Sequence, residues 1–190
     1  MSELIDKTLF SVSTDETKQH LTGIFFQAGD NIATSVSTDG HRLSMSEFGY
    51  EGDFSLEEGI IIPRKGAMEI KRLADSQAET LQMAYLVEKK LFSVRTQTVT
   101  LTVRIHDSKF PPFEQVIPKY KENRMVIPCA PFQQSLKRID LLSDGSESGV
   151  IFSISKDHLN LKGTDIMKGK AHEEMEVDHE GDEILWAMGR

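Results

Sequence analysis

Cysteine is almost absent from this chain of 190 residues, and long apolar runs are absent altogether. A single cysteine, Cys129, excludes an intramolecular disulfide and a cysteine-based zinc site. The longest apolar runs are far shorter than the roughly 18 residues of a membrane-spanning helix. Residues 1–7 also lack the basic and apolar regions of a signal peptide. We therefore expect a cytoplasmic protein with no membrane contact.

Positive charge is also scarce. The chain has 22 Lys and Arg residues and 30 Asp and Glu residues, which gives a net charge of −8. An acidic chain is an unusual binder of nucleic acid. The excess is concentrated near the C-terminus, however, and residues 1–172 carry 21 basic against 23 acidic side chains. Because residues 1–172 are nearly neutral, they can still form a local surface rich in Lys and Arg.

Hydrophobic residues make up 38% of the chain, which is ordinary for a globular protein, and their spacing predicts an α+β fold. A helix followed by three strands occurs twice in residues 4–105, which favours antiparallel sheets with helices on one face. Gly29, Asp30 and Asn31 predict a hairpin turn. The predicted helices cover residues 4–12, 64–74 and 131–142. The predicted strands cover residues 23–27, 32–38, 42–48, 60–63, 81–87, 91–96 and 98–105, with a loop at 49–59.

Prolines interrupt regular structure at residues 109–118, where four apolar side chains should still be buried: Phe110, Phe113, Val116 and Ile117. We interpret this segment as a packed link between domains. The predicted organisation is one domain at 1–115, a connector at 116–127 and a second domain at 128–190.

An internal repeat supports this division. Four residues recur 126 positions later, where Gly23, Phe26, Thr38 and Asp39 match Gly149, Phe152, Thr164 and Asp165. The same offset carries Pro63, which precedes the second helix of the first domain, to position 189. The second domain therefore holds one helix-and-strands unit where the first holds two, and we expect a truncated domain.

Three motifs in order resemble one family. They are Thr38-Asp-Gly-His-Arg-Leu43, Ile62-Pro-Arg-Lys-Gly66 at the start of a helix, and Lys109-Phe-Pro followed by Val116-Ile-Pro118. The chain is similar to the middle domain and half of the third domain of the bacterial DNA polymerase III beta subunit, the sliding clamp. The resemblance implies a non-enzymatic processivity factor, whose full-length form is a homodimeric ring around double-stranded DNA, bound without regard to sequence. It implies no cofactor and no metal.

The resemblance also implies a hydrophobic pocket beside the connector that receives peptides. Its expected partners are the catalytic subunit of DNA polymerase III, the clamp loader and other proteins with a clamp-binding motif. Carried over by position, the pocket residues are Leu21, Thr38, Gly40, His41, Arg42, Leu43, Pro111, Gln115 and Val116. Gln115 replaces a frequent arginine, so a carboxylate contact is expected to be weaker there. Because part of the family's pocket has no counterpart here, we expect the chain to bind such peptides poorly.

Basic residues on the predicted helices are the candidates for contact with DNA. Cations that meet phosphates hold a duplex without reading its sequence, as sliding requires. The candidate residues are Lys7, His20, Arg64, Lys65, Lys71, Arg72, Lys137 and Arg138. Exposed Lys and Arg on helices are common, so each of them could equally be an ordinary surface residue.

Parts of the sequence are also compatible with other functions. Asp39, His41 and a serine such as Ser37 or Ser44 could form a hydrolase triad, but no Gly-x-Ser-x-Gly motif is present. An alternating acidic strand could bind a metal through His172, Glu174, Glu176 and Asp178, although a solvated strand gives the same pattern. The main alternative is an interaction module that binds proteins without encircling DNA.

Overall fold

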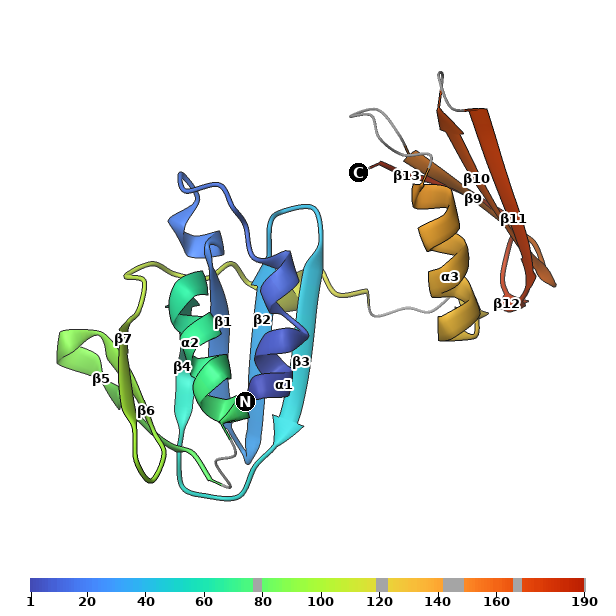
Figure 1. The fold of residues 1–190 in the computed structure, drawn as a ribbon. Helices are drawn as coiled ribbons and strands as arrows, with labels where there is room; N and C mark the ends of the chain where they lie inside the picture. The colour runs from blue at the N-terminus through green and yellow to red at the C-terminus, as the bar shows by residue number, and fades with distance from the viewer. Residues whose placement is uncertain (77–79, 119–122, 142–148, 166–168, 190) are drawn as a thin grey trace. The chain divides into compact units, whose positions relative to one another are not determined.

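The computed structural model describes residues 1–76, 80–118, 123–141, 149–165 and 169–189, which divide into two compact units (Figure 1). Unit 1 is Met1–Gln115 and unit 2 is Val116–Arg190. The predicted α+β class is confirmed. No described helix has the length and the apolar character that a membrane span requires.

The described residues of unit 1 form two helices, two antiparallel sheets and four short 3-10 helices. The larger sheet has the order β3-β2-β1-β4, and the smaller has the order β5-β6-β7. The helices are α1 (Ser2–Asp6) and α2 (Arg64–Asp75). The strands are β1 (Gly23–Gly29), β2 (Ile32–Thr38), β3 (Leu43–Gly49), β4 (Leu56–Pro63), β5 (Gln82–Leu86), β6 (Leu91–Arg95) and β7 (Thr100–Arg104). The 3-10 helices are η1 (Leu9–Ser11), η2 (Gln19–Leu21), η3 (Val87–Lys89) and η4 (Phe113–Gln115).

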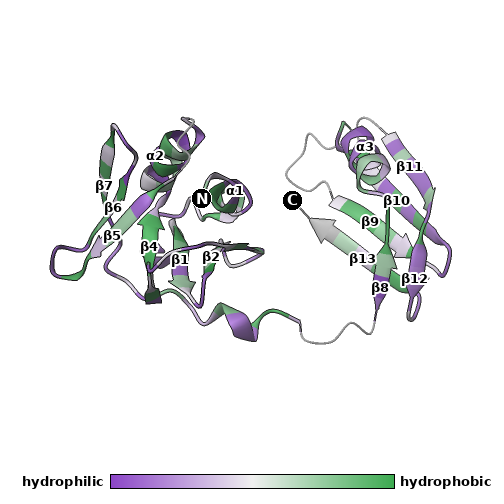
Figure 2. Cartoon of the chain, turned by 90° about the horizontal axis from the view of Figure 1, so that it is seen from below, coloured by the Kyte–Doolittle hydropathy of each residue, from purple (hydrophilic) through white to green (hydrophobic). Residues whose placement is uncertain are grey.

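Two apolar layers cover opposite faces of the larger sheet. Alternate strand residues such as Ile24 and Ile62 join the core that α1 and α2 complete with Leu4 and Ile70. The intervening residues, Val36 among them, join a second cluster with Phe110 and Phe113 of the connecting segment 105–118, which is the connector as the structure has it. Figure 2 shows the hydrophobic colour of β4, which contributes to both layers.

The predicted helix at 4–12 is wrong in its second half, because α1 ends at Asp6 and η1 follows. Side chains of β2 take up the hydrogen bonds that a continuous helix would use. Thr8 Oγ1 donates to the Leu4 carbonyl and bonds Ser35 Oγ at 2.8 Å. Ser37 Oγ donates to the Thr8 carbonyl. Side chains of β2 thus hold Thr8, and the backbone beyond it continues with 3-10 hydrogen bonds, such as that from the Ser11 N–H to the Thr8 carbonyl at 3.1 Å.

The loop predicted at 49–59 is also shorter than expected, because β4 begins at Leu56. Its pairing with β1 is interrupted by a bulge, since Phe26 pairs with Ile60 and Ala28 pairs with Leu56. Gly59 lies in the bulge with a φ of +66°, and a Cβ there would lie 2.3 Å from the Phe25 ring. The bulge therefore places a polar, glycine-containing stretch inside a strand.

Unit 2 holds α3 (Cys129–Asp140) and a sheet of order β11-β10-β9-β13. Its core joins Ile139 of the helix to Phe152, Leu159 and Leu161 of the sheet. The strands are β8 (Arg124–Val126), β9 (Gly149–Ile154), β10 (His158–Asp165), β11 (Gly169–Glu176), β12 (Asp178–Glu180) and β13 (Ile184–Gly189), with β8 paired to β12. Leu142, the last residue of the predicted third helix, lies outside the described residues.

The strand register reproduces the offset of 126. Phe26 pairs with Ser35, and Phe152 pairs with Leu161. Gly23 pairs with Pro63, and Gly149 pairs with Gly189. Strands β9, β10 and β13 therefore correspond to β1, β2 and β4, and the described part of unit 2 ends at the counterpart of β4.

Candidate functional site

The segment from Thr38 to Leu43 forms a tight turn between β2 and β3. Thr38 Oγ1 accepts the Gly40 N–H at 3.0 Å and donates to the Arg42 carbonyl at 2.7 Å. Asp39 Oδ1 accepts the N–H groups of His41 and Arg42 at 3.0 and 3.1 Å. Gly40 has a φ of +96°, which other residues rarely adopt. These local bonds fix the backbone that carries His41, Arg42 and Leu43.

The same bonds determine the electrostatics of Asp39. Partial burial raises the pKa of its carboxyl group, but the two backbone N–H groups and the Arg42 guanidinium outweigh this, so the pKa lies below its ordinary value. Arg42 Nε donates to Asp39 Oδ2 at 3.1 Å. Asp39 is therefore ionised at neutral pH and holds one side of the guanidinium.

An apolar cluster lies directly behind this turn. Leu43 packs against Leu21, Val36 and the two connector aromatics, Phe110 and Phe113. The Phe25 ring stacks on Phe110 with centroids 5.1 Å apart and an interplanar angle of 20°. Leu21 is only 6% exposed, so it supports the wall from behind. The structure thus brings together Leu21, Leu43 and the connector segment that contains Pro111.

The remaining pocket residues lie where the connector leaves this cluster. Pro111 is half-buried, and Gln115 is exposed at the end of η4. Val116 belongs to unit 2 and is 68% exposed, and Ile117 is also exposed. The prediction that Val116 and Ile117 are buried is therefore wrong, because Phe110 and Phe113 alone anchor the connector in the cluster.

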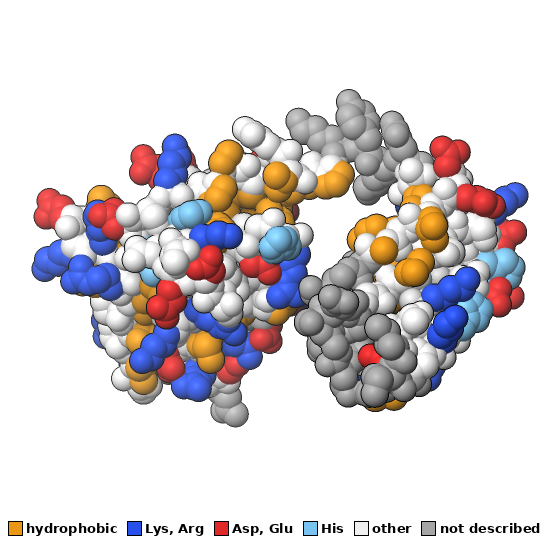
Figure 3. All heavy atoms as spheres, turned by 90° about the horizontal axis from the view of Figure 1, so that it is seen from above, with side chains coloured by type: hydrophobic (Ala, Val, Ile, Leu, Met, Phe, Trp, Pro, Cys, Tyr) orange, Lys and Arg blue, Asp and Glu red, His pale blue; other side chains and the backbone are white. Residues whose placement is uncertain are grey.

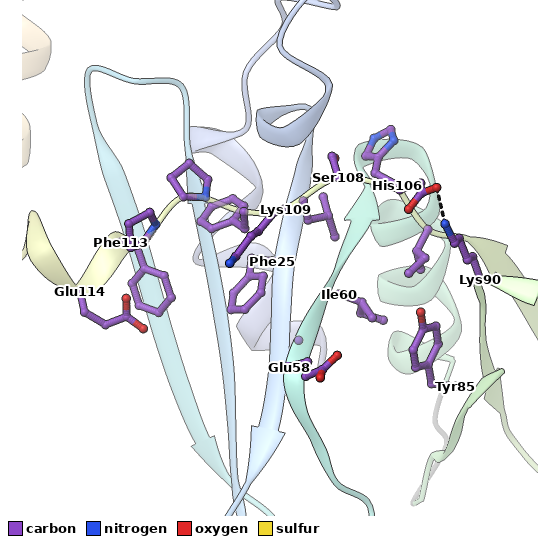
Figure 4. Close-up of a pocket in the computed structure, with 17 residues that line it drawn as sticks. Phe25, Glu58, Ile60, Tyr85, Lys90, His106, Ser108, Lys109, Phe113 and Glu114 are labelled. Carbon is purple, nitrogen blue, oxygen red and sulfur yellow. Dashed lines mark ion pairs between the residues drawn. The ribbon is translucent and has the colours of Figure 1, made fainter. Parts of the chain in front are cut away.

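A cavity of about 770 Å³ borders this cluster within unit 1 (Figure 4). Phe25 and Ile60 line it from the larger sheet, Tyr85 lines it from β5, and the connector contributes residues 105–114. Lys90 and Asp107 form an ion pair at its edge. Burial lowers the pKa of His106, whose Nε2 lies 3.2 Å from Thr22 Oγ1. Pro111 is the residue that this cavity shares with the predicted pocket.

Four of the eight candidate DNA-binding residues are paired with acidic side chains. Lys7 lies 2.6 Å from Glu3, and Arg72 lies 2.8 Å from Glu69. Lys71 lies 3.2 Å from both Asp6 and Asp75, whose hydrogen bonds raise the pKa of its ammonium group. On the face of unit 1 shown in Figure 3, Lys and Arg side chains are interspersed with Asp and Glu. These pairs reduce the net positive charge of the helical surface.

In unit 2, Arg138 forms a bidentate pair with Glu173, at 2.7 and 2.6 Å. Hydrogen bonds from Arg138 are the main cause that lowers the pKa of Glu173 to about 2, and a hydrogen bond from Ser135 makes a smaller contribution. His20 lies in η2 and is half-buried. Within the part of the chain that the structure describes, four candidates carry no ion pair: His20, Arg64, Lys65 and Lys137.

The side chains proposed for a hydrolase serve structural roles. Ser37 is fully buried and donates to the Thr8 carbonyl. Ser44 Oγ bonds Ser11 Oγ at 2.6 Å. His41 is exposed, and Asp39 is occupied by the turn and by Arg42. This arrangement provides no nucleophile beside a base.

The acidic strand β11 does not form a metal centre in the described residues, which contain no group of three or more His, Cys, Asp and Glu side chains suited to a metal ion. His172 Nε2 lies 3.0 Å from Asn160 Oδ1, and Glu174 lies 3.7 Å from His158. Alternating residues of β11 are exposed, as expected for a solvated strand face.

Phe10 contacts the turn at 38–43, and the sequence patterns do not reveal this contact. It lies in η1 and is 58% exposed. Its carbonyl accepts Arg42 Nη2 at 2.9 Å, and the guanidinium carbon lies 5.8 Å from its ring centroid. No periodicity links positions 10 and 42, because their contact depends on how η1 packs against β2 and β3.

Comparisons with known proteins divide the chain between two domain families. Residues 1–112 match the central domain of the DNA polymerase III beta subunit, and residues 114–188 match its C-terminal domain. Among curated proteins, the beta sliding clamp of Caulobacter vibrioides is 31% identical over 184 residues, which are 94% of this chain and 49% of the relative. That of Vibrio cholerae is 27% identical, over 95% of this chain and 49% of the relative.

Solved structures give the same result. The DNA polymerase III beta subunit of Thermotoga maritima superimposes with a TM-score of 0.89 at 27% identity, over 99% of this chain and 50% of that chain. A Caulobacter crescentus clamp, described with PEG in a candidate beta-motif tethering region, has a TM-score of 0.90 at 28% identity, over 99% and 50%. The chain spans about half the length of the relatives that it matches.

Proposed function

The chain belongs to the DNA polymerase III beta subunit family, and from this membership we propose that it contributes two parts of a sliding clamp. The first is one wall of a pocket for partner peptides, formed by the turn at 38–43 and the connector. The second is a helical surface that faces duplex DNA. The whole protein would be a non-enzymatic processivity factor that keeps a polymerase on its template.

The apolar cluster behind the turn carries the pocket proposal. Leu43 and the connector aromatics form one surface, while Thr38 and Asp39 fix the backbone at its rim. An extended peptide with Leu or Phe anchors suits such a wall, because apolar side chains supply affinity and a few polar groups supply orientation. The expected partners are the polymerase catalytic subunit, the clamp loader and other proteins with the same peptide motif.

A peptide titration tests this pocket. The probe is a fluorescein-labelled peptide with the sequence Ala-Leu-Asp-Leu-Phe-Ala, titrated to millimolar concentration of the chain and followed by anisotropy. Leu43→Asp places a carboxylate in the apolar wall, and we expect affinity to fall at least tenfold, which is about 1.4 kcal/mol. Met45→Asp is the matched control, since Met45 lies on the same strand, is 40% exposed and is absent from the cluster.

Circular dichroism separates loss of binding from loss of fold in these variants. Because Leu43 is half-buried, His41→Ala provides a second variant at an exposed position of the turn. Equal affinity for the parent chain, Leu43→Asp and His41→Ala would remove the pocket assignment. An equal loss of peptide affinity in Met45→Asp and in Leu43→Asp would also contradict the pocket assignment.

The DNA surface rests on the packing of α1 and α2 against each other on one face of the larger sheet (Figure 1). Arg64 and Lys65 begin α2 without an acidic partner among the described residues. Phosphate contacts of this kind weaken steeply with salt. We expect Lys65→Glu to weaken binding to duplex DNA more than Arg72→Glu, because Arg72 is already paired with Glu69.

The alternative is an interaction module that binds peptides and does not encircle DNA. The acidic partners of Lys7, Lys71, Arg72 and Arg138 favour it, because they reduce the positive charge that a duplex would meet. Band-shift titrations at 50 and 200 mM salt distinguish the two. The module is supported if duplex affinity is independent of salt and of Lys65→Glu while the labelled peptide still binds.

A further inference from the structure

The cavity beside the connector is lined by three strands and differs from the predicted peptide pocket (Figure 4). Its volume of about 770 Å³ lies in the range of sites that hold small organic molecules. Phe25 of β1, Ile60 of β4 and Tyr85 of β5 line it. Within the described lining, Pro111 is the one residue that the cavity shares with the predicted pocket. The cavity is therefore a second candidate ligand site, and the chemistry of its lining indicates the ligand.

A bulge in β4 brings a carboxylate to this cavity. In a regular strand, Leu56, Glu58 and Ile60 would lie on one face, because side chains alternate. Leu56 and Ile60 do lie in the core under the helices, but Glu58 is exposed and lines the cavity. Gly59, with a φ of +66°, interrupts the alternation, and the Phe25 ring lies 2.3 Å from the place that a Cβ of Gly59 would take. The bulge thus places Glu58 near the Phe25 ring (Figure 4).

The charges of the lining leave the Glu58 carboxylate uncompensated. No ion pair or side-chain hydrogen bond among the described residues involves it. Lys90 is neutralised by the ion pair described above, and burial lowers the pKa of His106, so its ring is neutral at pH 7. The connector adds the ammonium group of Lys109 and the carboxylate of Glu114, whose charges offset each other. The lining therefore favours a positively charged ligand.

The rest of the lining is rich in aromatic rings. The Phe25 ring stacks on Phe110 with centroids 5.1 Å apart. Tyr85 adds a half-buried ring, and its hydroxyl group has no hydrogen bond among the described residues and can accept one. Aromatic faces attract cations, and carboxylates accept strong hydrogen bonds from ammonium groups. An amine with a flat apolar body matches both the rings and the charge.

We propose that this cavity binds a small aromatic amine, with the ammonium group on Glu58 and Tyr85 and the apolar body against Phe25. This site is additional to the peptide pocket and does not depend on it. The cavity is open to solvent, so we expect a dissociation constant on the order of 1 mM for a ligand of about a dozen heavy atoms.

Two probes with the same indole ring test the preference for a cation. At pH 7, tryptamine carries an ammonium group and indole-3-propionate carries a carboxylate. Each is titrated into the nitrogen-15-labelled chain, and the assigned backbone amide signals of Gly59 and Ile60 are followed by NMR. We expect saturable shifts with tryptamine, and binding of indole-3-propionate at least fivefold weaker.

Substitutions in β4 and β5 test the named contacts. Glu58→Gln keeps the shape of the side chain and removes its charge, and we expect the affinity for tryptamine to fall about fivefold, since a charge-assisted hydrogen bond is stronger than a neutral one. Tyr85→Phe keeps the ring, removes the hydroxyl group and should lower the affinity about twofold. Glu57→Gln is the matched control, because Glu57 is exposed on the same strand and does not line the cavity.

Each outcome supports or overturns the site, whether or not a partner peptide binds the chain. Equal affinity for the two probes overturns the preference for a cation. Equal losses in Glu58→Gln and Glu57→Gln show only general attraction to an acidic surface and overturn the site. Tryptamine that leaves the Gly59 and Ile60 signals unshifted at 10 mM also overturns it. Unchanged affinity in Tyr85→Phe removes the hydroxyl group from the proposed contacts.

Discussion

The ionisation of Glu173 is coupled to the fold through its contacts with Arg138 and Ser135. The pKa of its carboxyl group is lowered from 4.5 to about 2, chiefly by the hydrogen bonds from Arg138. A pKa that is depressed in the folded state stabilises the protein above the unfolded value, and this stabilisation is lost as the pH falls through the folded value. The contribution of Glu173 is therefore complete above pH 4.5 and declines toward pH 2.

A charge-removing substitution tests this dependence. Glu173→Gln should lower the melting temperature of unit 2 at pH 6, and its difference from the parent chain should shrink below pH 4.5 and disappear near pH 2. Thermal melts between pH 2 and 7 measure the difference. Glu176→Gln, on the same strand and without an ion pair among the described contacts, should show no comparable change. A difference that is constant across this range would contradict the assignment.

Gly163 shows how one small residue permits helix packing. A Cβ at this position would lie 2.6 Å from Ile139 Cγ2, and Ile139 is fully buried. Gly163→Ala should therefore push α3 away from β10 and cost about 1–3 kcal/mol of unfolding free energy. Urea unfolding measures the loss, with the exposed neighbour Lys162→Ala as control. Equal stabilities would show that α3 adjusts freely.

For single residues, the sequence predicts hydrogen bonds between neighbouring positions, but it does not predict contacts between positions that are far apart in the chain. The turn at 38–43 is predictable because the residues that fix it, Asp39 and Gly40, lie inside it. The Phe10–Arg42 contact spans 32 positions and leaves no pattern in the sequence. Val116 is apolar and near prolines, which favoured burial, yet Phe113 already occupies the adjoining cluster.

Among the elements, α1 and η1 show how tertiary bonds override local spacing. Apolar residues recur at helical intervals from Leu4 to Val12, which is why one helix was predicted. The structure ends α1 at Asp6 because Thr8 bonds β2 instead. In α3, which has the same place in the repeat, the helix continues to Asp140. Hydrophobic spacing thus located both elements, but it could not show that buried hydroxyl groups would shorten one of them.

Removing one side-chain oxygen atom, that of Ser37, should weaken the attachment of η1 to β2. Ser37 is fully buried, and its hydroxyl donates to the Thr8 carbonyl. Ser37→Ala removes this donor, while the Ser11 N–H still bonds the carbonyl at 3.1 Å, and we expect a loss of about 0.5–1.5 kcal/mol in the free energy of unfolding. Urea denaturation measures it. Ser46→Ala on β3 is the control, because no described hydrogen bond involves the Ser46 hydroxyl, and a similar loss there would contradict this explanation.

At the scale of the whole molecule, the two units have separate cores. Ile70 belongs to the core of unit 1 and Ile139 to that of unit 2, and both are fully buried. The internal repeat points to two related units, because a matched glycine and a matched phenylalanine recur at one offset and share a strand register. The bulge in β4 was not predictable in this way, since β13 pairs with β9 without a shift.

Separate cores predict separate unfolding transitions, and the single tryptophan makes them distinguishable. Trp186 packs against Phe152 in unit 2, with ring centroids 5.3 Å apart, so its fluorescence reports unit 2. Ile139→Ala should shift the fluorescence transition in urea by about 2–5 kcal/mol, the usual cost of truncating a buried isoleucine. Ile70→Ala should leave that transition in place and shift the far-ultraviolet dichroism of the rest of the chain. If both variants move the tryptophan transition equally, the units unfold as one cooperative structure, because a core defect in unit 1 would then destabilise unit 2 as well.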